Sequence, residues 1–304
     1  MSLLPLPVAQ APTVPLIALD QLWFQVAGTV CNLRCRHCFI SCAPDNHNLW
    51  FLSREEVARA LEESVELGVK EYYFTGGEPF MHHDLEDMLE DTLRLGPATV
   101  LTNGTLLPGR RVERLRGLAE CSRYSLEFRV SIDGMDPEAN DAIRGLGTFA
   151  RALKGVGRLV DAGFLPIVTT MQSWPDTETD RILYGFHEAL ARVGYDRPRL
   201  KILPPLLMGA ESERTRGYLP TERVTPGMMD GFDVDLLLCS RARLVTSKGV
   251  LPCPILADEP DATLAPGLTE SMDRPARLSE QACYTCYVHG AICANLPMGA
   301  RDFG

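Results

Sequence analysis

Short apolar runs alternate with amphipathic helical patterns along the first two thirds of this chain of 304 residues. Runs typical of β-strands lie at residues 22–27, 72–75, 98–102, 126–132, 165–170 and 200–203. Helical patterns separate them at residues 53–67, 84–93, 112–118, 149–162 and 177–192. Successive strand–helix units favour right-handed crossovers and a parallel sheet. The alternation therefore predicts an α/β fold, either a doubly wound sheet or a partial barrel.

Polar and glycine-rich segments follow four of the predicted strands. They are a cysteine-rich segment after the first strand, Gly76-Gly77-Glu78-Pro79 after the second, Asn103-Gly104 after the third and Asp133-Gly134 after the fourth. In parallel α/β folds, ligands bind at the carboxyl ends of the strands. We therefore expect these segments to meet in a single active site.

The cysteine-rich segment places three thiols close together, at Cys31, Cys35 and Cys38. Soft thiolate ligands select zinc or iron–sulfur clusters. Closed sites of either kind take four protein ligands, so three thiolates leave one metal position open for another molecule. Cys42 follows four residues later and could supply the fourth ligand, which would close the site.

Composition narrows the class of protein. Hydrophobic residues make up 45% of the chain and its net charge is −10, which argues against nucleic-acid binding through a basic face. No apolar run approaches the ~18 residues of a membrane span. The cysteines are not spaced as in a short secreted disulfide scaffold, so we expect a cytoplasmic protein with reduced thiols. Residues 1–20 contain several prolines and are expected to form an N-terminal arm.

Five motifs resemble those of the radical S-adenosylmethionine (SAM) superfamily. They are CNLRCRHC at 31–38, TGGEPF at 75–80, LTNGT at 101–105, SIDG at 131–134 and NDAIRGLGTF at 140–149. The resemblance covers about residues 21–204 and implies a partial (βα)6 TIM-like barrel. In that superfamily three cysteines bind a [4Fe–4S] cluster, and the amino and carboxylate groups of SAM chelate the fourth iron. One electron then cleaves SAM to a 5′-deoxyadenosyl radical, which takes a hydrogen atom from the substrate.

The resemblance assigns roles to individual residues. Cys31, Cys35 and Cys38 are the expected cluster ligands, whereas Cys42 lies outside the motif and is expected not to bind the cluster. The residues expected to bind SAM are Gly76, Gly77, Glu78, Pro79, Asn103, Ser131 and Arg144.

Some of these residues have structural alternatives. Asn103 could cap a helix, and Arg144 could form a surface ion pair with Asp141. Glu127 and Arg129 are in phase with the end of the fourth predicted strand and share its inner face. They are expected either to contact substrate or to form a buried ion pair.

A second group of cysteines lies in the last quarter of the chain. Its members are Cys239, Cys253, Cys283, Cys286 and Cys293. Their pattern is similar to the auxiliary-cluster extensions called SPASM and Twitch, which implies one auxiliary [4Fe–4S] cluster. The first four are the favoured ligands, and Cys293 could replace one of the last pair; a structural zinc site is the alternative. In sulfatase-type maturases an Asp follows the cysteine that matches Cys253, and Pro254 at this position argues against that activity.

These features predict four segments: an arm at 1–20, the radical SAM barrel at 21–204, a linker or lid at 205–232 and a small auxiliary-cluster domain at 233–304. The resemblance implies a low-potential electron donor, flavodoxin or ferredoxin. The substrate is expected to be a small molecule or a peptide, and Cys31 lies too near the start of this sequence for a preceding leader-binding domain. Two alternatives are an iron–sulfur protein that only transfers electrons and a zinc-stabilised binding protein.

Overall fold

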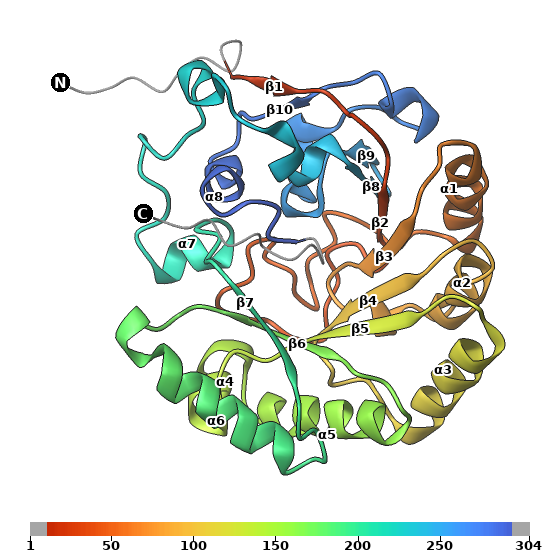
Figure 1. Ribbon diagram of the computed structural model, residues 1–304, viewed down its shortest axis with the longest axis vertical. Helices are drawn as coiled ribbons and strands as arrows, with labels where there is room; N and C mark the ends of the chain where they lie inside the picture. The colour runs from red at the N-terminus through yellow and green to blue at the C-terminus, as the bar shows by residue number, and fades with distance from the viewer. Residues whose placement is uncertain (1–10, 294–304) are drawn as a thin grey trace.

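The computed structural model describes residues 11–293 and shows an α/β molecule built around one large sheet (Figure 1). Residues 1–10 of the predicted arm and residues 294–304 of the predicted auxiliary domain lie outside the described part. None of the helices within residues 11–293 is long and apolar enough to cross a membrane.

Six parallel strands of this sheet are adjacent in the order of the chain. They are β2 (Gln21–Gln25), β3 (Glu71–Thr75), β4 (Ala98–Thr102), β5 (Leu126–Ser131), β6 (Ile167–Met171) and β7 (Arg199–Leu203). Each corresponds to one predicted strand, and the sheet curves into an open barrel, which confirms the partial (βα)6 fold (Figure 1).

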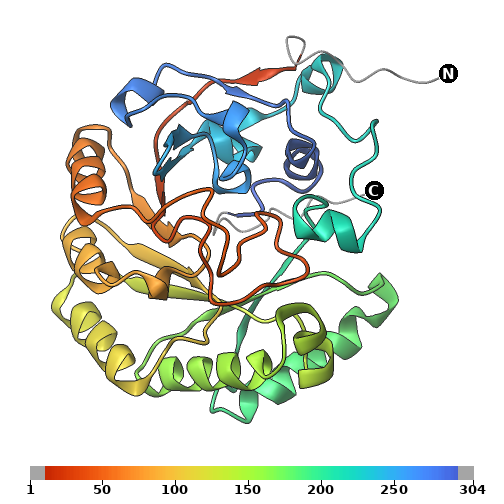
Figure 2. The ribbon, with the colours of Figure 1, turned by 180° about the vertical axis from the view of Figure 1, so that it is seen from behind.

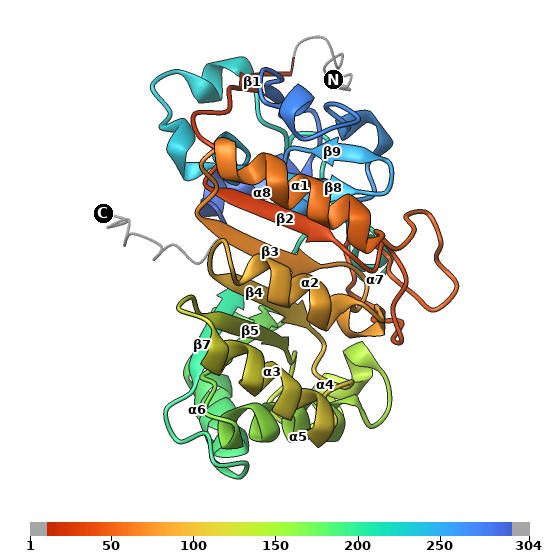
Figure 3. The same cartoon turned by 90° about the vertical axis from the view of Figure 1, so that its right-hand side faces the viewer.

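Helices connect these strands and cover the outer face of the sheet (Figure 3). They are α1 (Arg54–Glu66), α2 (Leu85–Thr92), α3 (Gly109–Cys121), α4 (Pro137–Arg144), α5 (Thr148–Asp161) and α6 (Thr179–Ala191). A capping box opens α1, since Ser53 Oγ accepts from Glu56 N while Glu56 accepts from Ser53 N. By contrast, α4 was not predicted, because Asn140 is its one buried residue and an apolar period is absent.

Alternation along the strands separates an apolar outer layer from a more polar interior. Even-numbered side chains such as Phe24, Phe74 and Phe128 are fully buried against the helices. Odd-numbered side chains such as Trp23 and Arg129 point into the barrel. The helices and the outer face therefore supply the hydrophobic core, and the inner face is left for a site.

The C-terminal part of the chain continues the same sheet. Strand β8 (Ala242–Thr246) pairs in parallel with β2, and β9 (Gly249–Leu251) pairs antiparallel with β8. A separate two-stranded sheet is formed by β1 (Thr13–Val14), which pairs antiparallel with β10 (Ala276–Arg277). The predicted division into four segments remains a prediction, and this pairing shows that segments from both ends of the chain pack directly on the barrel.

Short helices fill the remaining connections. Two are α-helices, α7 (Ala210–Arg214) and α8 (Ala282–His289). The 3₁₀ helices are Pro79–Met81, Asp176–Glu178, Pro226–Met229, Val234–Leu236, Leu238–Ser240, Pro254–Leu256, Pro260–Ala262 and Thr269–Ser271.

We predict that Phe74→Ala destabilises the barrel strongly. Phe74 is fully buried on β3 and stacks on Phe24 with ring centroids 5.3 Å apart. Its truncation should cost about 3–5 kcal/mol of unfolding free energy. The control is Tyr184→Ala, at a side chain on α6 that is 68% exposed, and it should change the unfolding free energy by less than about 0.5 kcal/mol. Urea unfolding followed by circular dichroism measures both, and equal effects would contradict this assignment of the core.

Candidate functional site

One cavity at the carboxyl ends of the barrel strands collects most of the predicted site residues. Its wall includes Cys31, Cys35, Cys38, Gly76, Gly77, Asn103, Ser131, Arg144 and Cys293. This barrel cavity holds about 1340 Å³ of space between atoms, part of it open to solvent. Figure 2 shows the loop after β2, which carries the first three cysteines, lying between the barrel and the C-terminal segment. The predicted single active site is therefore brought together by the fold.

Hydrogen bonds from the protein point at two sulfurs of the cysteine loop. Cys31 Sγ accepts from Leu33 N at 3.4 Å and from Asn103 Nδ2 at 3.8 Å. Cys38 Sγ accepts from Cys42 N at 3.2 Å, and the Cys42 thiol donates to the same sulfur, which lowers the pKa of Cys38. Such donors stabilise a thiolate. Cys42 is therefore a hydrogen-bond partner of Cys38, which agrees with its place outside the motif.

Burial has the opposite effect on the other two thiols. It raises the pKa of Cys31 to about 12 and that of Cys35 to about 11. Both thiols are therefore protonated at neutral pH until a metal centre displaces the protons.

The spacing of the sulfurs distinguishes a cluster from a single ion. Around tetrahedral zinc, with Zn–S bonds of about 2.3 Å, ligand sulfurs lie roughly 4 Å apart. Within residues 11–293, no three cysteine sulfurs all lie within 4.8 Å of one another. A [4Fe–4S] cluster spreads its thiolates over separate irons and needs a wider arrangement. The cysteines thus fit a cluster better than a zinc ion.

The glycine-rich turn after β3 packs directly on the cysteine loop. A Cβ on Gly77 would lie 2.0 Å from Val30 O, and one on Gly76, whose φ is +146°, would lie 2.8 Å from Ala27 N. The backbone is joined there by the bond from Gly77 N to Gly28 O at 2.9 Å. Both glycines are therefore needed for contact between two protein segments, in addition to any contact with a ligand.

Glu78 has a different place from the one expected. It is fully buried, and its carboxylate accepts from Asn103 N and Thr102 Oγ1, each at 2.7 Å, and from Phe80 N at 3.1 Å. Neither Glu78 nor the adjacent Pro79 is among the residues of the cavity wall. Burial raises the pKa of Glu78, while these donors oppose the rise. Its observed contacts hold the ends of β3 and β4 together behind the wall.

Asn103 does not cap a helix. Its Oδ1 accepts from Thr105 N at 3.0 Å, a local turn, while Nδ2 donates to Asn32 Oδ1 at 2.8 Å. The next helix, α3, has Pro108 at its N-cap. Asn103 therefore connects the end of β4 to the cysteine loop.

The buried carboxylate of Asp133 links three parts of the site, although no individual role was predicted for it. Asp133 Oδ2 accepts from Arg144 Nε at 2.5 Å and lies 2.6 Å from His37 Nε2, and Oδ1 accepts from Met171 N at 2.8 Å. Burial alone would raise the pKa of Asp133, but Arg144 and His37 outweigh it and hold the pKa well below its usual range. The signal was present in the SIDG motif, which ends with this residue and its neighbour.

The surface alternative for Arg144 is wrong. Arg144 pairs with Asp133, whereas Asp141 accepts from Gly147 N at 2.6 Å and Phe149 N at 2.8 Å at the start of α5. Arg144 is the last residue of α4 and lines the cavity.

The inner face of β5 carries Glu127, Arg129 and Ser131, which the alternation along the strand predicted to share one face. Ser131 and Arg129 line the cavity, and Glu127 forms an ion pair with Arg199 at 3.1 Å. Arg129 also donates to the carbonyl oxygen of Cys293, and its guanidinium lies 5.3 Å from the centroid of the Tyr73 ring. The barrel interior is thus in direct contact with the C-terminal cysteine segment.

Four of the C-terminal cysteines surround a second, smaller cavity of about 410 Å³. This four-cysteine cavity is lined by Cys239, Cys253, Cys283 and Cys286 together with apolar side chains. Burial raises the pKa of Cys239 to about 11 and that of Cys253 to about 12. Cys293 lines the barrel cavity instead and is not part of this wall.

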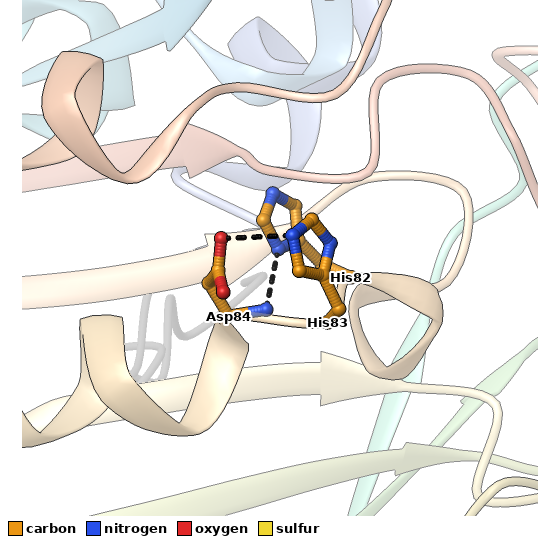
Figure 4. Close-up of side chains that lie close together, drawn as sticks. All are labelled: His82, His83 and Asp84. Atoms are coloured by element: carbon orange, nitrogen blue, oxygen red, sulfur yellow. Dashed lines mark hydrogen bonds and ion pairs between the residues drawn. The ribbon is translucent and has the colours of Figure 1, made fainter.

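A compact group of side chains follows the glycine-rich turn after β3 and consists of His82, His83 and Asp84 (Figure 4). These side chains form hydrogen bonds and an ion pair within the protein. His82 Nε2 lies 2.7 Å from Leu52 O, and His82 Nδ1 accepts from Asp84 N at 3.0 Å. His83 Nε2 pairs with Asp84 Oδ2 at 3.1 Å. Both ring nitrogens of His82 therefore have partners within the protein.

Comparison with known proteins agrees with this geometry. The model of the Radical SAM superfamily matches residues 26–182, a little over half of the chain. The chain is 32% identical over 189 residues to an AdoMet-dependent heme synthase of Nitratidesulfovibrio vulgaris, covering 61% of this chain and 48% of the relative. It is also 32% identical over 149 residues to a probable GTP 3′,8-cyclase of Methanosarcina mazei, covering 46% of this chain and 42% of the relative. The chain thus spans about half the length of these curated relatives or less.

Two solved structures share the fold. SuiB of Streptococcus suis, bound to the precursor peptide SuiA, superposes with a TM-score of 0.61 at 17% identity, covering 86% of this chain and 64% of that one. The enzyme anSMEcpe with bound AdoMet gives a TM-score of 0.60 at 16% identity, covering 84% of this chain and 80% of that one. The three-cysteine loop, the barrel and the family match agree, and the chain belongs to the radical SAM superfamily of enzymes.

Proposed function

We propose that this enzyme binds SAM at a [4Fe–4S] cluster held by Cys31, Cys35 and Cys38, and that it abstracts a hydrogen atom from a small-molecule or peptide substrate. The observation that carries the proposal is the barrel cavity, whose wall holds three thiols of one loop together with Arg144 and the glycine turn. When bound, the cluster and SAM supply the 5′-deoxyadenosyl radical. The protein's part is to position these groups and to exclude water.

Arg144 is the residue that we assign to the SAM carboxylate. Its Nε is held by Asp133, which fixes the guanidinium plane and leaves the terminal nitrogens for a second carboxylate. We assign the SAM amino group to the backbone at Gly76 and Gly77, and the ribose to Ser131 and Asn103, because all four line the same cavity. Glu78 and Pro79 then act by positioning this turn.

The substrate occupies the rest of the barrel cavity in this proposal. The wall of the barrel cavity carries buried donors that have no hydrogen-bond partner within residues 11–293, among them Trp23 Nε1 and Thr169 Oγ1. A bound polar group would satisfy them. SuiB was crystallised with a precursor peptide, and GTP 3′,8-cyclases are named for a nucleotide, so relatives support either substrate class.

We further assign an auxiliary [4Fe–4S] cluster to Cys239, Cys253, Cys283 and Cys286, because these four surround one apolar cavity. Cys293 lines the barrel cavity but its thiol also acts on Cys253 and Cys286, so it is the alternative ligand in place of one of the last pair. A flavodoxin or ferredoxin is the proposed electron donor. The alternatives, a simple electron carrier and a zinc-stabilised binding protein, would not cleave SAM, and the zinc protein would contain no iron or sulfide.

Cys35→Ala should abolish SAM cleavage, because two thiolates cannot hold the open cluster. The protein is reconstituted anaerobically with iron and sulfide, and 5′-deoxyadenosine is measured after addition of dithionite and SAM. Iron should fall from about eight to about four per chain. The matched control is Cys121→Ala, since Cys121 is an exposed thiol at the end of α3, and it should behave as wild type. Equal 5′-deoxyadenosine from the two variants would overturn the ligand assignment.

Cys283→Ala should retain SAM cleavage but lose substrate turnover, with iron again near four per chain. The reason is that Cys283 lines the four-cysteine cavity and not the barrel cavity. Product formation is followed by mass spectrometry once a substrate accelerates 5′-deoxyadenosine release. Full turnover by this variant would remove any catalytic role of the auxiliary cluster.

Asp133→Asn should weaken SAM binding about 10- to 100-fold, because the carboxylate charge that holds Arg144 and His37 is lost. Equilibrium dialysis of the reconstituted protein measures the change. Asp161→Asn, the same substitution at an exposed end of α5, is the control. If the two variants bind SAM equally at equal iron content, Asp133 does not position Arg144 for SAM.

A further inference from the structure

A fully buried arginine lies beside the four-cysteine cavity. Arg243 is on β8 and is 0% exposed. Its Nη1 donates to Cys239 O at 3.2 Å and to Ala242 O at 2.9 Å, and its Nη2 donates to Ser271 O at 3.3 Å and to Arg274 O at 2.8 Å. The side chain is therefore fixed entirely by backbone carbonyl groups, one of which belongs to a proposed cluster ligand.

The charge of this guanidinium lacks a carboxylate counter-charge. Within residues 11–293 no Asp or Glu forms an ion pair with Arg243, and the ionisable groups that act on it are Cys239 and Cys253. An arginine cannot lose its charge under ordinary conditions. Burial of an unbalanced charge is costly, so the fold must supply a negative group nearby. The thiolates of the four-cysteine cavity, once they bind a cluster, provide that group.

We propose that Arg243 is the electrostatic partner of the auxiliary cluster and raises its reduction potential, so that this cluster accepts an electron from the substrate radical. This inference rests on the proposed function, specifically on the auxiliary [4Fe–4S] cluster. A cluster with four thiolates is anionic and gains one more negative charge on reduction. A fixed positive charge in a buried region therefore stabilises the reduced state more than the oxidised state.

The charges around the cysteine loop differ from those around the four-cysteine cavity. The groups that act on Cys35 include one cation, Arg144, and two carboxylates, Asp133 and Glu78. Beside Cys239 the acting charge is Arg243, and beside Cys283 it is the carboxylate of Glu280. In this proposal Arg243 therefore makes the auxiliary cluster easier to reduce than it would be without this charge.

If the auxiliary cluster accepts this electron, the reaction is a two-electron oxidation of the substrate. Reductive cleavage of SAM consumes one electron from the cluster at the cysteine loop. The substrate loses one hydrogen atom to the 5′-deoxyadenosyl radical, then one electron to the auxiliary cluster and one proton to solvent, which leaves a new double bond or ring bond. The auxiliary cluster would take up this one electron and would pass it to an external acceptor, an oxidised flavodoxin or ferredoxin.

The test is a redox titration of the reconstituted full chain followed by electron paramagnetic resonance, with SAM added to separate the two cluster signals. Arg243→Gln keeps N–H donors but removes the charge, and should shift the auxiliary cluster to lower potential. Arg243→Lys keeps the charge and should stay near wild type. Arg241→Gln is the matched control, since Arg241 is two residues away but pairs with Asp20 and Asp235 at the surface.

A second measurement covers variants that fold or load poorly. Reconstitution should raise the unfolding midpoint of wild type more than that of Arg243→Gln, because the cluster balances the charge only in wild type. A purely structural role for Arg243 would lower the midpoints of the iron-free and loaded forms equally, and would overturn the proposal. The proposal would also be overturned if two clusters are present and the reduction potential shifts equally in Arg243→Gln and Arg243→Lys, or shifts in neither. Wild type with about four irons and one cluster signal would instead refute the auxiliary cluster itself.

Discussion

The active-site end of this enzyme depends on one buried carboxylate. Asp133 pairs with Arg144 from α4 and with His37 from the cysteine loop, and it also accepts the backbone N–H of Met171 at the end of β6. Three segments far apart in the sequence are thereby held at the mouth of the barrel. The Arg144 guanidinium and the His37 ring both face this buried carboxylate, so the cysteine loop and the proposed SAM carboxylate site are fixed together.

The sequence predicted the barrel well because its strands are apolar and its helices have clear periods. All six parallel strands and the gathering of the motif residues at their carboxyl ends followed from that pattern. Helix α4 was missed because it is short and polar. The inward or outward direction of Glu78 could not be predicted, since it depends on hydrogen bonds from Thr102 and Asn103 across the sheet.

The C-terminal segment is joined to the barrel more closely than its sequence suggested. Strand β8 adds to the barrel sheet beside β2, and the carbonyl of Cys293 accepts a hydrogen bond from Arg129 of the barrel interior (Figure 1). The sequence identified the cysteines, but the tertiary structure separates four that share one cavity from a fifth that lines the barrel cavity.

The central claim is that three cysteines leave one iron open for SAM. Electron–nuclear double resonance tests it directly on the reduced, reconstituted protein, with SAM labelled by ¹⁵N in its amino group and ¹⁷O in its carboxylate. Our account predicts hyperfine coupling of both labels to the cluster, because both groups bind the open iron. A fully loaded cluster that shows no coupling to either label would mean that the open position does not hold SAM, and the account would be wrong.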